Sequence, residues 1–264
     1  MSRNWFWTIN RRSRKLGFEV SKWPGESSLN RLIDLVKELS DPLKHSKDYA
    51  DYSRLILGLS LILDRGDLPT SQLGQDCWVL GQMDGLSGTF LEIGAYHPKQ
   101  WSNTYLLRKA FGWTGFHIDP SYTSEEIFRN FGLGEYFIRK AVGKTSATGF
   151  LVGEGAFAQV VEASQHSQTS SSAYSSPDIP VEIVTPAFLL DMTGKIDYLS
   201  LDIEGGEFEV LEVWPFNICA PKVVTVEHNH RIQDKEKMDV LMEKNGYRKV
   251  LGELSDFESW FLRP

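Results

Sequence analysis

The chain has 264 residues, of which 41% are hydrophobic and 24% are charged, a composition typical of folded globular proteins rather than disordered ones. The formal net charge of −7 disfavours nucleic acid as a partner, because nucleic-acid-binding domains usually carry a basic face. The two cysteines, Cys77 and Cys219, are far apart in the chain and predict neither a disulfide framework nor a zinc site.

The N-terminal residues 1–26 are basic and aromatic. A secretory signal has its basic residues before the apolar stretch, whereas here Arg11 and Arg12 follow it. The longest apolar run, 55–63, is much shorter than the roughly 20 residues that span a membrane. We therefore expect a cytoplasmic protein without a transmembrane segment. The arm itself fits two interpretations, a contact with a membrane surface or partner, or a loosely held segment that packs its aromatic side chains on the domain.

Two segments, 29–36 and 52–63, have apolar residues at helical spacing and predict amphipathic helices. Together with the basic arm they form a predicted N-terminal extension over residues 1–70. These helices offer a surface through which the chain could form a homo-oligomer. We expect residues 71–264 to form one further domain.

A buried strand that enters a tight turn at Gly94 is predicted near the middle of the chain. A helix opened by Ser102 or Asn103 follows, and then a second strand ends at Asp119. The order strand, glycine turn, helix, strand and acid is an arrangement that binds nucleosides. In such a site the glycine lets the backbone approach the ligand, and the acid accepts hydrogen bonds from both ribose hydroxyls.

The residues around this glycine indicate which cofactor fits. A dinucleotide site has the pattern G-x-G-x-x-G, but here Tyr96, His97 and Pro98 follow Gly94, so a pyrophosphate would meet side chains. Glu92 lies two residues before the glycine, where its carboxylate would face an ammonium group. A cofactor with a ribose, a positive charge and no phosphate fits better, which favours S-adenosylmethionine. On this motif alone, an ordinary βαβ unit with a chance glycine remains the alternative.

The third predicted strand covers 136–138 and ends at 141–143, beside the position of an adenine in a doubly wound sheet. Between it and the second strand, Thr123 and Glu126 predict a helix with a capping box. The complete set of predicted cofactor-binding residues is Glu92, Gly94, Ala95, Asn103, Asp119, Pro120, Ala141, Val142 and Asp202.

The segment 164–178 is rich in serine and almost without apolar residues. Long loops of this kind in compact domains are lids, binding loops or disordered segments, and both a lid over the acceptor and simple disorder fit this one. The flanking segments 147–152 and 181–184 predict strands that pair, and Pro186 begins a short helix.

Two further buried strands end in polar groups. The first ends in Asp202 and Glu204, and the second in Glu227, His228 and Asn229. Ligands bind at the carboxyl ends of the strands in open α/β sheets, so these groups should meet at the same edge as the glycine turn. A helix over 234–244 and two closing strands over 247–251 and 257–262, expected as an antiparallel hairpin, complete the pattern. It predicts an α/β fold with a Rossmann-like seven-stranded methyltransferase sheet and helices on both faces.

At these residues the chain resembles the FkbM family of S-adenosylmethionine-dependent methyltransferases. The resemblance covers residue 71 to the end, but not the first seventy residues. The family pattern usually continues past the glycine with an asparagine and a second glycine, which this chain lacks. The matching stretches are Ser71–Asp76, Phe90–Ala95, Ser102–Leu107, Gly112–Pro120, Asp197–Gly205 and Val226–Asn229.

The resemblance implies O-methylation, often of a sugar hydroxyl in a glycan, glycolipid or secondary metabolite, so the expected partner is a small-molecule or glycan acceptor. Asp202, Glu227 and Asn229 lie where catechol-type O-methyltransferases place their magnesium ligands, and hard oxygen ligands suit Mg²⁺ or another divalent cation. His228 is the candidate catalytic base, because imidazole titrates near neutral pH. Asp202 is the second candidate catalytic residue and would orient His228 if no metal is bound. The alternative for Asp202 and Glu204 is helix capping.

Two other classes of function are alternatives to a methyltransferase. A nicotinamide-dependent oxidoreductase would need the dinucleotide motif that is missing here. A non-catalytic interaction module built on a cofactor-binding fold would not need Asp119, Asp202 and Glu227, which are all present.

Overall fold

The computed structural model describes residues 49–153, 155, 158–163, 179–252 and 257–264. Within these, the chain forms two compact units, one containing 49–87, 99–113 and 250–252, and the other containing the remaining described residues. The predicted helix over 29–36 and the serine-rich segment 164–178 lie outside the described residues. The predicted domain boundary at residue 70 stays a prediction.

The first unit contains the three helices α3 (Tyr49–Asp64), α4 (Gln75–Gln82) and α5 (Tyr105–Phe111). Helix α3 covers the helix predicted over 52–63. It lies unusually close to α4, because a Cβ atom added to Gly58 would be 1.7 Å from the carbonyl oxygen of Cys77. A Cβ atom on Gly81 would likewise be 1.7 Å from the carbonyl oxygen of Arg54. The two glycines thus allow the helix backbones to touch.

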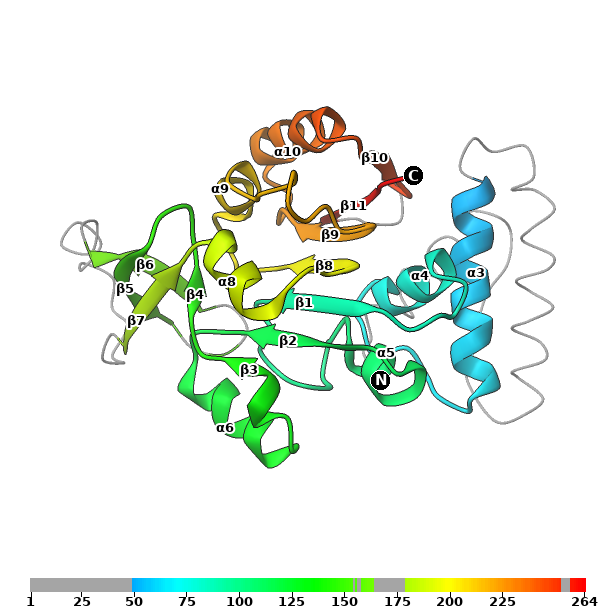
Figure 1. Ribbon diagram of the computed structural model, residues 1–264, viewed down its shortest axis with the longest axis horizontal. Coiled ribbons are helices and arrows are strands. Elements are labelled where there is room, and N and C mark those ends of the chain that lie inside the picture. The colour runs from blue at the N-terminus through cyan, green and yellow to red at the C-terminus, as the bar shows by residue number, and fades with distance from the viewer. Residues whose placement is uncertain (1–48, 154, 156–157, 164–178, 253–256) are drawn as a thin grey trace. The chain divides into compact units, whose positions relative to one another are not determined.

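The second unit is built on a seven-stranded sheet with the order β10-β11-β9-β8-β1-β2-β3 (Figure 1). Neighbouring strands from β9 to β3 are parallel, and β11 is antiparallel to β9. This confirms the predicted α/β fold with a seven-stranded sheet. The strands are β1 (Thr89–Ile93), β2 (Thr114–Ile118), β3 (Phe137–Ile138), β8 (Tyr198–Leu201), β9 (Val223–Glu227), β10 (Arg248–Val250) and β11 (Glu258–Leu262).

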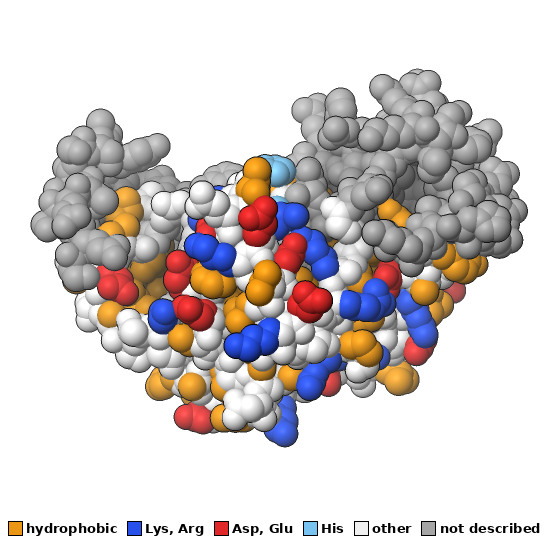
Figure 2. Space-filling view, turned by 90° about the horizontal axis from the view of Figure 1, so that it is seen from above, with side chains coloured by type: hydrophobic (Ala, Val, Ile, Leu, Met, Phe, Trp, Pro, Cys, Tyr) orange, Lys and Arg blue, Asp and Glu red, His pale blue; other side chains and the backbone are white. Residues whose placement is uncertain are grey.

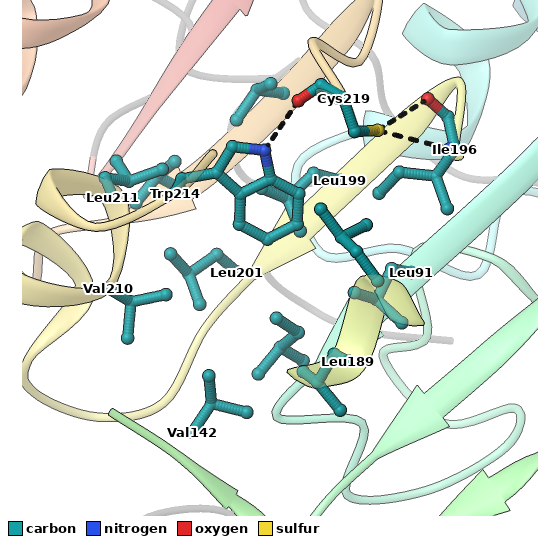
Figure 3. Packing of buried hydrophobic residues seen from close by; sticks show 14 of the residues in the cluster. Leu91, Val142, Leu189, Ile196, Leu199, Leu201, Val210, Leu211, Trp214 and Cys219 are labelled. Carbon is teal, nitrogen blue, oxygen red and sulfur yellow. Dashed lines mark hydrogen bonds between the residues drawn. The ribbon is translucent and has the colours of Figure 1, made fainter. Parts of the chain in front are cut away.

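One face of this sheet forms a large apolar core, part of which Figure 3 shows. Leu91, Leu199 and Leu201 contribute from the strands, because side chains two residues apart point to the same face. Trp214 closes the core and donates a hydrogen bond from its indole nitrogen to the carbonyl oxygen of Cys219, at 2.9 Å. The connecting helices are α6 (Tyr122–Asn130), the 3₁₀-helix η1 (Gly134–Tyr136), α8 (Pro186–Thr193), α9 (Glu207–Glu212) and α10 (Ile232–Lys244).

A second sheet of four strands, in the order β4-β7-β5-β6, lies at the left of Figure 1. Its strands β5 and β7 pair antiparallel, as predicted for the segments 147–152 and 181–184. The prediction of one strand over 136–143 was wrong, because β3 belongs to the large sheet whereas β4 pairs with β7. The strands of the second sheet are β4 (Ala141–Val142), β5 (Ala147–Val152), β6 (Gln159–Glu162) and β7 (Ile179–Val184).

The predicted capping box of α6 was also wrong. Thr123 and Glu126 lie inside the helix, and the N-cap residue is Ser121, whose hydroxyl accepts a hydrogen bond from the amide of Ser124. Ser121 follows Pro120 and has an extended backbone, the conformation that is typical of an N-cap residue directly before a helix. Among the described residues, no helix is both long and apolar enough to cross a bilayer.

We predict that Gly58→Ala destabilises the protein although alanine favours helices. The intrinsic gain of about 1 kcal/mol is smaller than the cost of forcing α3 away from α4, which we expect to leave a net loss of about 1 to 3 kcal/mol. Urea unfolding measures the difference. Gly134→Ala is the control, because its added Cβ atom would lie at an ordinary contact distance of 3.5 Å. Equal stability of the two variants would contradict the close helix contact.

Candidate functional site

Strand β1 lies between β2 and β8 in the sheet, so the chain connects outward from it in both directions. Such a reversal of strand order is where open α/β sheets bind ligands, beyond the carboxyl ends of the strands. Gly94 follows β1 with a φ of 85°, and an added Cβ atom would lie 1.5 Å from the carbonyl oxygen of Asp202. The glycine is therefore needed because the ends of β1 and β8 touch. The expectation that it lets backbone approach a ligand stays a prediction.

Asp119 follows β2 and ties two loops together. Its Oδ2 atom accepts a hydrogen bond from the amide of Tyr96 at 3.0 Å, and its Oδ1 atom accepts one from the amide of Ser121 at 2.8 Å. Burial raises the pKa of the Asp119 carboxyl group, and the two amide hydrogen bonds oppose this shift. A carboxylate oxygen can accept two hydrogen bonds, so this arrangement leaves acceptor capacity for a ligand hydroxyl.

Glu92 points to the opposite face of β1 from the apolar core. Its Oε2 atom lies 2.8 Å from Nδ1 of His117 on β2, and both side chains are buried. The imidazole packs against the rings of Phe90 and Phe128, with centroid distances of 5.1 and 4.7 Å. His117 was not among the predicted site residues, although its register opposite Glu92 follows from the pairing of the two strands. The predicted role of Glu92 toward a cofactor ammonium group stays a prediction.

The other predicted cofactor residues lie in three places. Ala95 is buried beside Gly94, and Pro120 follows Asp119 directly. Asn103 is buried in the first unit, just before α5, where the hydroxyl of the preceding Ser102 accepts the amide of Tyr105. Ala141 and Val142 form β4, so they belong to the second sheet rather than to the end of β3.

Three carboxylates meet at the ends of β8 and β9. One oxygen atom from each of Asp202, Glu204 and Glu227 lies within 4.8 Å of the others. Asn229 joins this group, because its amide nitrogen donates to Glu204 at 3.0 Å and to Glu227 at 2.9 Å. The structure therefore brings together all three predicted metal ligands and adds Glu204. In this conformation Asn229 directs its NH₂ group, not its oxygen, at the carboxylates.

The closeness of these acids changes their protonation. Burial raises the pKa of Asp202 to about 7, and the neighbouring carboxylates add to the shift. Burial also raises the pKa of Glu227, which donates a hydrogen bond to Asp202 when protonated. Like charges this close cannot all ionise without a compensating cation. Near neutral pH the cluster therefore either holds a proton or attracts a positive ligand.

His228, the predicted base, is buried and has both ring nitrogens in backbone hydrogen bonds. Its Nε2 atom lies 2.9 Å from the carbonyl oxygen of Glu258, and its Nδ1 atom accepts the amide of His230 at 3.2 Å. These partners fix a neutral imidazole with the proton on Nε2. Burial lowers the pKa of His228, which agrees with that state. In this conformation neither nitrogen is available to accept a substrate proton.

Helix capping does not explain Asp202 and Glu204. The N-cap residue of α9 is Gly206, and no side chain caps it. Instead, Glu207 at the first position of the helix accepts the amides of Ile203 and Gly205. Neither this contact nor the hydrogen bond from Gln159 to the backbone of the same loop was found from the sequence, because neither follows a local pattern.

Together, the seven-stranded sheet with antiparallel β11 and the polar strand ends at its point of reversal define a methyltransferase-type α/β fold. In a comparison with family models, residues 92–249 match the Methyltransferase FkbM domain. The match spans more than half of the chain and contains Gly94, Asp119 and the ends of β8 and β9. The chain therefore belongs to the FkbM methyltransferase family, as its sequence motifs predicted. A search of curated proteins found no match.

We predict that Asp202→Asn stabilises the metal-free protein at alkaline pH. A carboxyl group with a pKa near 7 in the folded chain and near 4 in the unfolded chain binds protons more strongly when folded, so stability falls as the pH rises between these values. The variant should gain about 1 to 3 kcal/mol over the wild type at pH 8, and this gain should vanish toward pH 4.

Urea unfolding in the presence of a chelator, repeated across this pH range, measures the effect. Asp191→Asn is the control, because Asp191 is exposed on α8, away from the cluster. If the difference in unfolding free energy between Asp202→Asn and the wild type does not change with pH, the pKa of Asp202 is not raised in the folded chain.

Proposed function

We propose that this protein is an S-adenosylmethionine-dependent O-methyltransferase that acts on a hydroxyl group of a sugar in a glycan, glycolipid or secondary metabolite. Family membership supports methyl transfer. The observation that supports the finer proposal is the carboxylate cluster of Asp202, Glu204 and Glu227, beside the turn at Gly94. A sugar hydroxyl is a weak nucleophile, so its methylation requires a group that removes or stabilises its proton.

The charge of the site agrees with this cofactor. S-adenosylmethionine carries a sulfonium and an ammonium group, and both are attracted to an edge that bears Asp119, Asp202 and Glu227. A nicotinamide dinucleotide would bring a doubly charged pyrophosphate to the same edge, where these acids would repel it. The chemistry of the side chains therefore fits the sulfonium cofactor better than the rival one.

The bound cofactor would supply a methyl group on a sulfonium sulfur, and a divalent cation would lower the pKa of the acceptor hydroxyl. Asp119 would accept hydrogen bonds from the ribose hydroxyls through its remaining lone pairs. The carboxylates of Asp202 and Glu227 would hold the cation and orient the acceptor oxygen, and a carboxylate oxygen of this pair would take its proton. Orientation of the two reacting atoms supplies much of the rate enhancement in such transfers.

We assign the proton acceptor to the carboxylate pair rather than to His228, whose ring nitrogens both face backbone groups. Its predicted role as base stays a prediction that would require these two hydrogen bonds to break. The proposed acceptor is a small molecule or glycan and not a nucleic acid. Figure 2, which views the side of α10, shows acidic and basic side chains interspersed there, without a continuous basic surface among the described residues.

We predict that S-adenosylhomocysteine binds in the micromolar range and that Asp119→Ala weakens this binding by about 1.5 to 3 kcal/mol, through the loss of charge-assisted hydrogen bonds. Isothermal titration calorimetry measures both affinities, and NAD is titrated in parallel. The control is Glu126→Ala, which removes an exposed carboxylate nearby on α6.

Unchanged affinity in Asp119→Ala would remove this residue from the cofactor site. Binding of NAD in place of S-adenosylhomocysteine would support the oxidoreductase alternative. A protein that binds neither ligand would be the non-catalytic module.

We also predict that methyl transfer depends on a divalent cation. Transfer of a labelled methyl group from S-adenosylmethionine to a panel of sugars and glycan extracts should stop after exhaustive chelation and return with Mg²⁺, because a cation relieves the repulsion within the cluster. Asp202→Asn should then lower the rate by about a hundredfold or more, the size of a general acid–base contribution.

His228→Asn separates the two possible bases. A loss in this variant as large as that in Asp202→Asn, with the fold intact by circular dichroism, would return the role of base to the imidazole. Full activity after chelation would eliminate the metal while leaving the carboxylate pair as proton acceptor.

A further inference from the structure

Glu207 is a buried acid for which the proposed chemistry has no use. Its side chain is 0% exposed at the first position of α9. Its Oε1 atom accepts two amides of the preceding loop, from Ile203 at 3.2 Å and from Gly205 at 2.8 Å. A buried carboxylate with these partners still needs a positive charge, because burial of an unpaired ion is very costly.

Arg231 supplies that charge from the N-cap position of α10. Its Nη2 atom lies 2.5 Å from Oε2 of Glu207, so both carboxylate oxygens have partners. The guanidinium also lies against the loop, since a Cβ atom added to Gly205 would be 3.3 Å from its Nη1 atom. Arg231, at the start of α10, thus holds Glu207 and the loop that precedes α9.

The loop 202–206 needs such support because its backbone is strained. Glu204 has a φ of 59°, which is uncommon for a residue with a side chain. Gly205 and Gly206 also have positive φ values, of 140° and 93°. Glycine adopts positive φ values at little cost, whereas the conformation of Glu204 persists only where surrounding contacts impose it. This strained conformation is the one that carries the carboxylates of Asp202 and Glu204 to Glu227.

We propose that Glu207 and Arg231 are positioning residues that hold the loop 202–206 in the conformation in which Asp202 and Glu204 meet Glu227. Glu207 binds the loop amides, and Arg231 pairs with Glu207 and keeps it aimed at them. The importance of this pair for catalysis rests on the proposed function, but its effect on the loop does not. Neither residue touches the reacting atoms in this proposal.

The test compares backbone hydrogen exchange and Mn²⁺ binding in matched variants of the full chain. Glu207→Gln keeps the shape of the side chain but loses the charge, and Arg231→Gln removes the cation. We expect exchange of the peptide that covers 202–206 to become at least about tenfold faster in both. Mn²⁺, a probe visible by electron paramagnetic resonance, should bind at least about tenfold more weakly.

Two further variants show whether the effect passes through this contact. The double variant of Glu207→Gln and Arg231→Gln should be no more than about threefold worse than either single variant, because residues that act through one contact are not additive. Arg231→Lys should restore part of the protection. Asp234→Asn removes the other, partly exposed partner of Arg231, at 3.5 Å, and should leave both measurements unchanged.

Exchange within about twofold of the wild type in both single variants would overturn the proposal. Faster exchange with unchanged Mn²⁺ binding would overturn it too, since the loop would then not position the carboxylates. If the wild type binds no Mn²⁺, the metal part of the proposed function fails, and the exchange measurements alone decide on the pair. A far-ultraviolet circular dichroism spectrum and a urea unfolding transition like those of the wild type show that the variants are folded.

Discussion

The contact between the end of β1 and the end of β8 sets the geometry of the whole site. Gly94 lies against the carbonyl group of Asp202, and the amide of Asp202 donates to the carbonyl of Ile93 at 2.9 Å. The amide of Gly94 donates in turn to Ile118 of β2. Three strand ends are thereby locked to one another, so the polar groups that follow them cannot separate. Any side chain on Gly94 would push Asp202 away and open this edge.

An edge fixed in this way concentrates negative charge. Asp202, Glu204 and Glu227 lie within 4.8 Å of one another, and the described residues offer them Asn229 as a neutral donor. In the part of the chain that the structure describes, the guanidinium of Arg231 is directed at Glu207 instead. The described residues therefore leave the cluster short of positive charge. Such a deficit lowers stability, and it is typical of sites where a ligand supplies the missing charge.

The sequence predicted which groups meet at this edge but not how they are oriented. Parallel strands bring their carboxyl ends together, and this alone places Asp202 beside Glu227. The state of His228 depends on the carbonyl of Glu258, from a strand thirty residues later, and no local pattern reveals that contact. The prediction of the N-cap of α6 failed for a different reason. Serine and threonine are both common N-cap residues, and the residue at which β2 ends determines that the helix begins after Ser121 rather than after Thr123.

The orientation of His228 bears directly on the chemistry. An imidazole with both nitrogens bonded to backbone groups holds the end of β9 against β11, where the amide of His228 also donates to Phe257 at 2.9 Å. Its function in this conformation is to fix Glu227 and Asn229, which flank it in the chain. The proposed methylation of a hydroxyl group requires a proton acceptor, and in the metal-free chain the neighbouring group with a pKa raised to about 7 is the carboxyl of Asp202. The burial that makes this acid costly in the folded chain is thus what suits it to accept a proton near neutral pH.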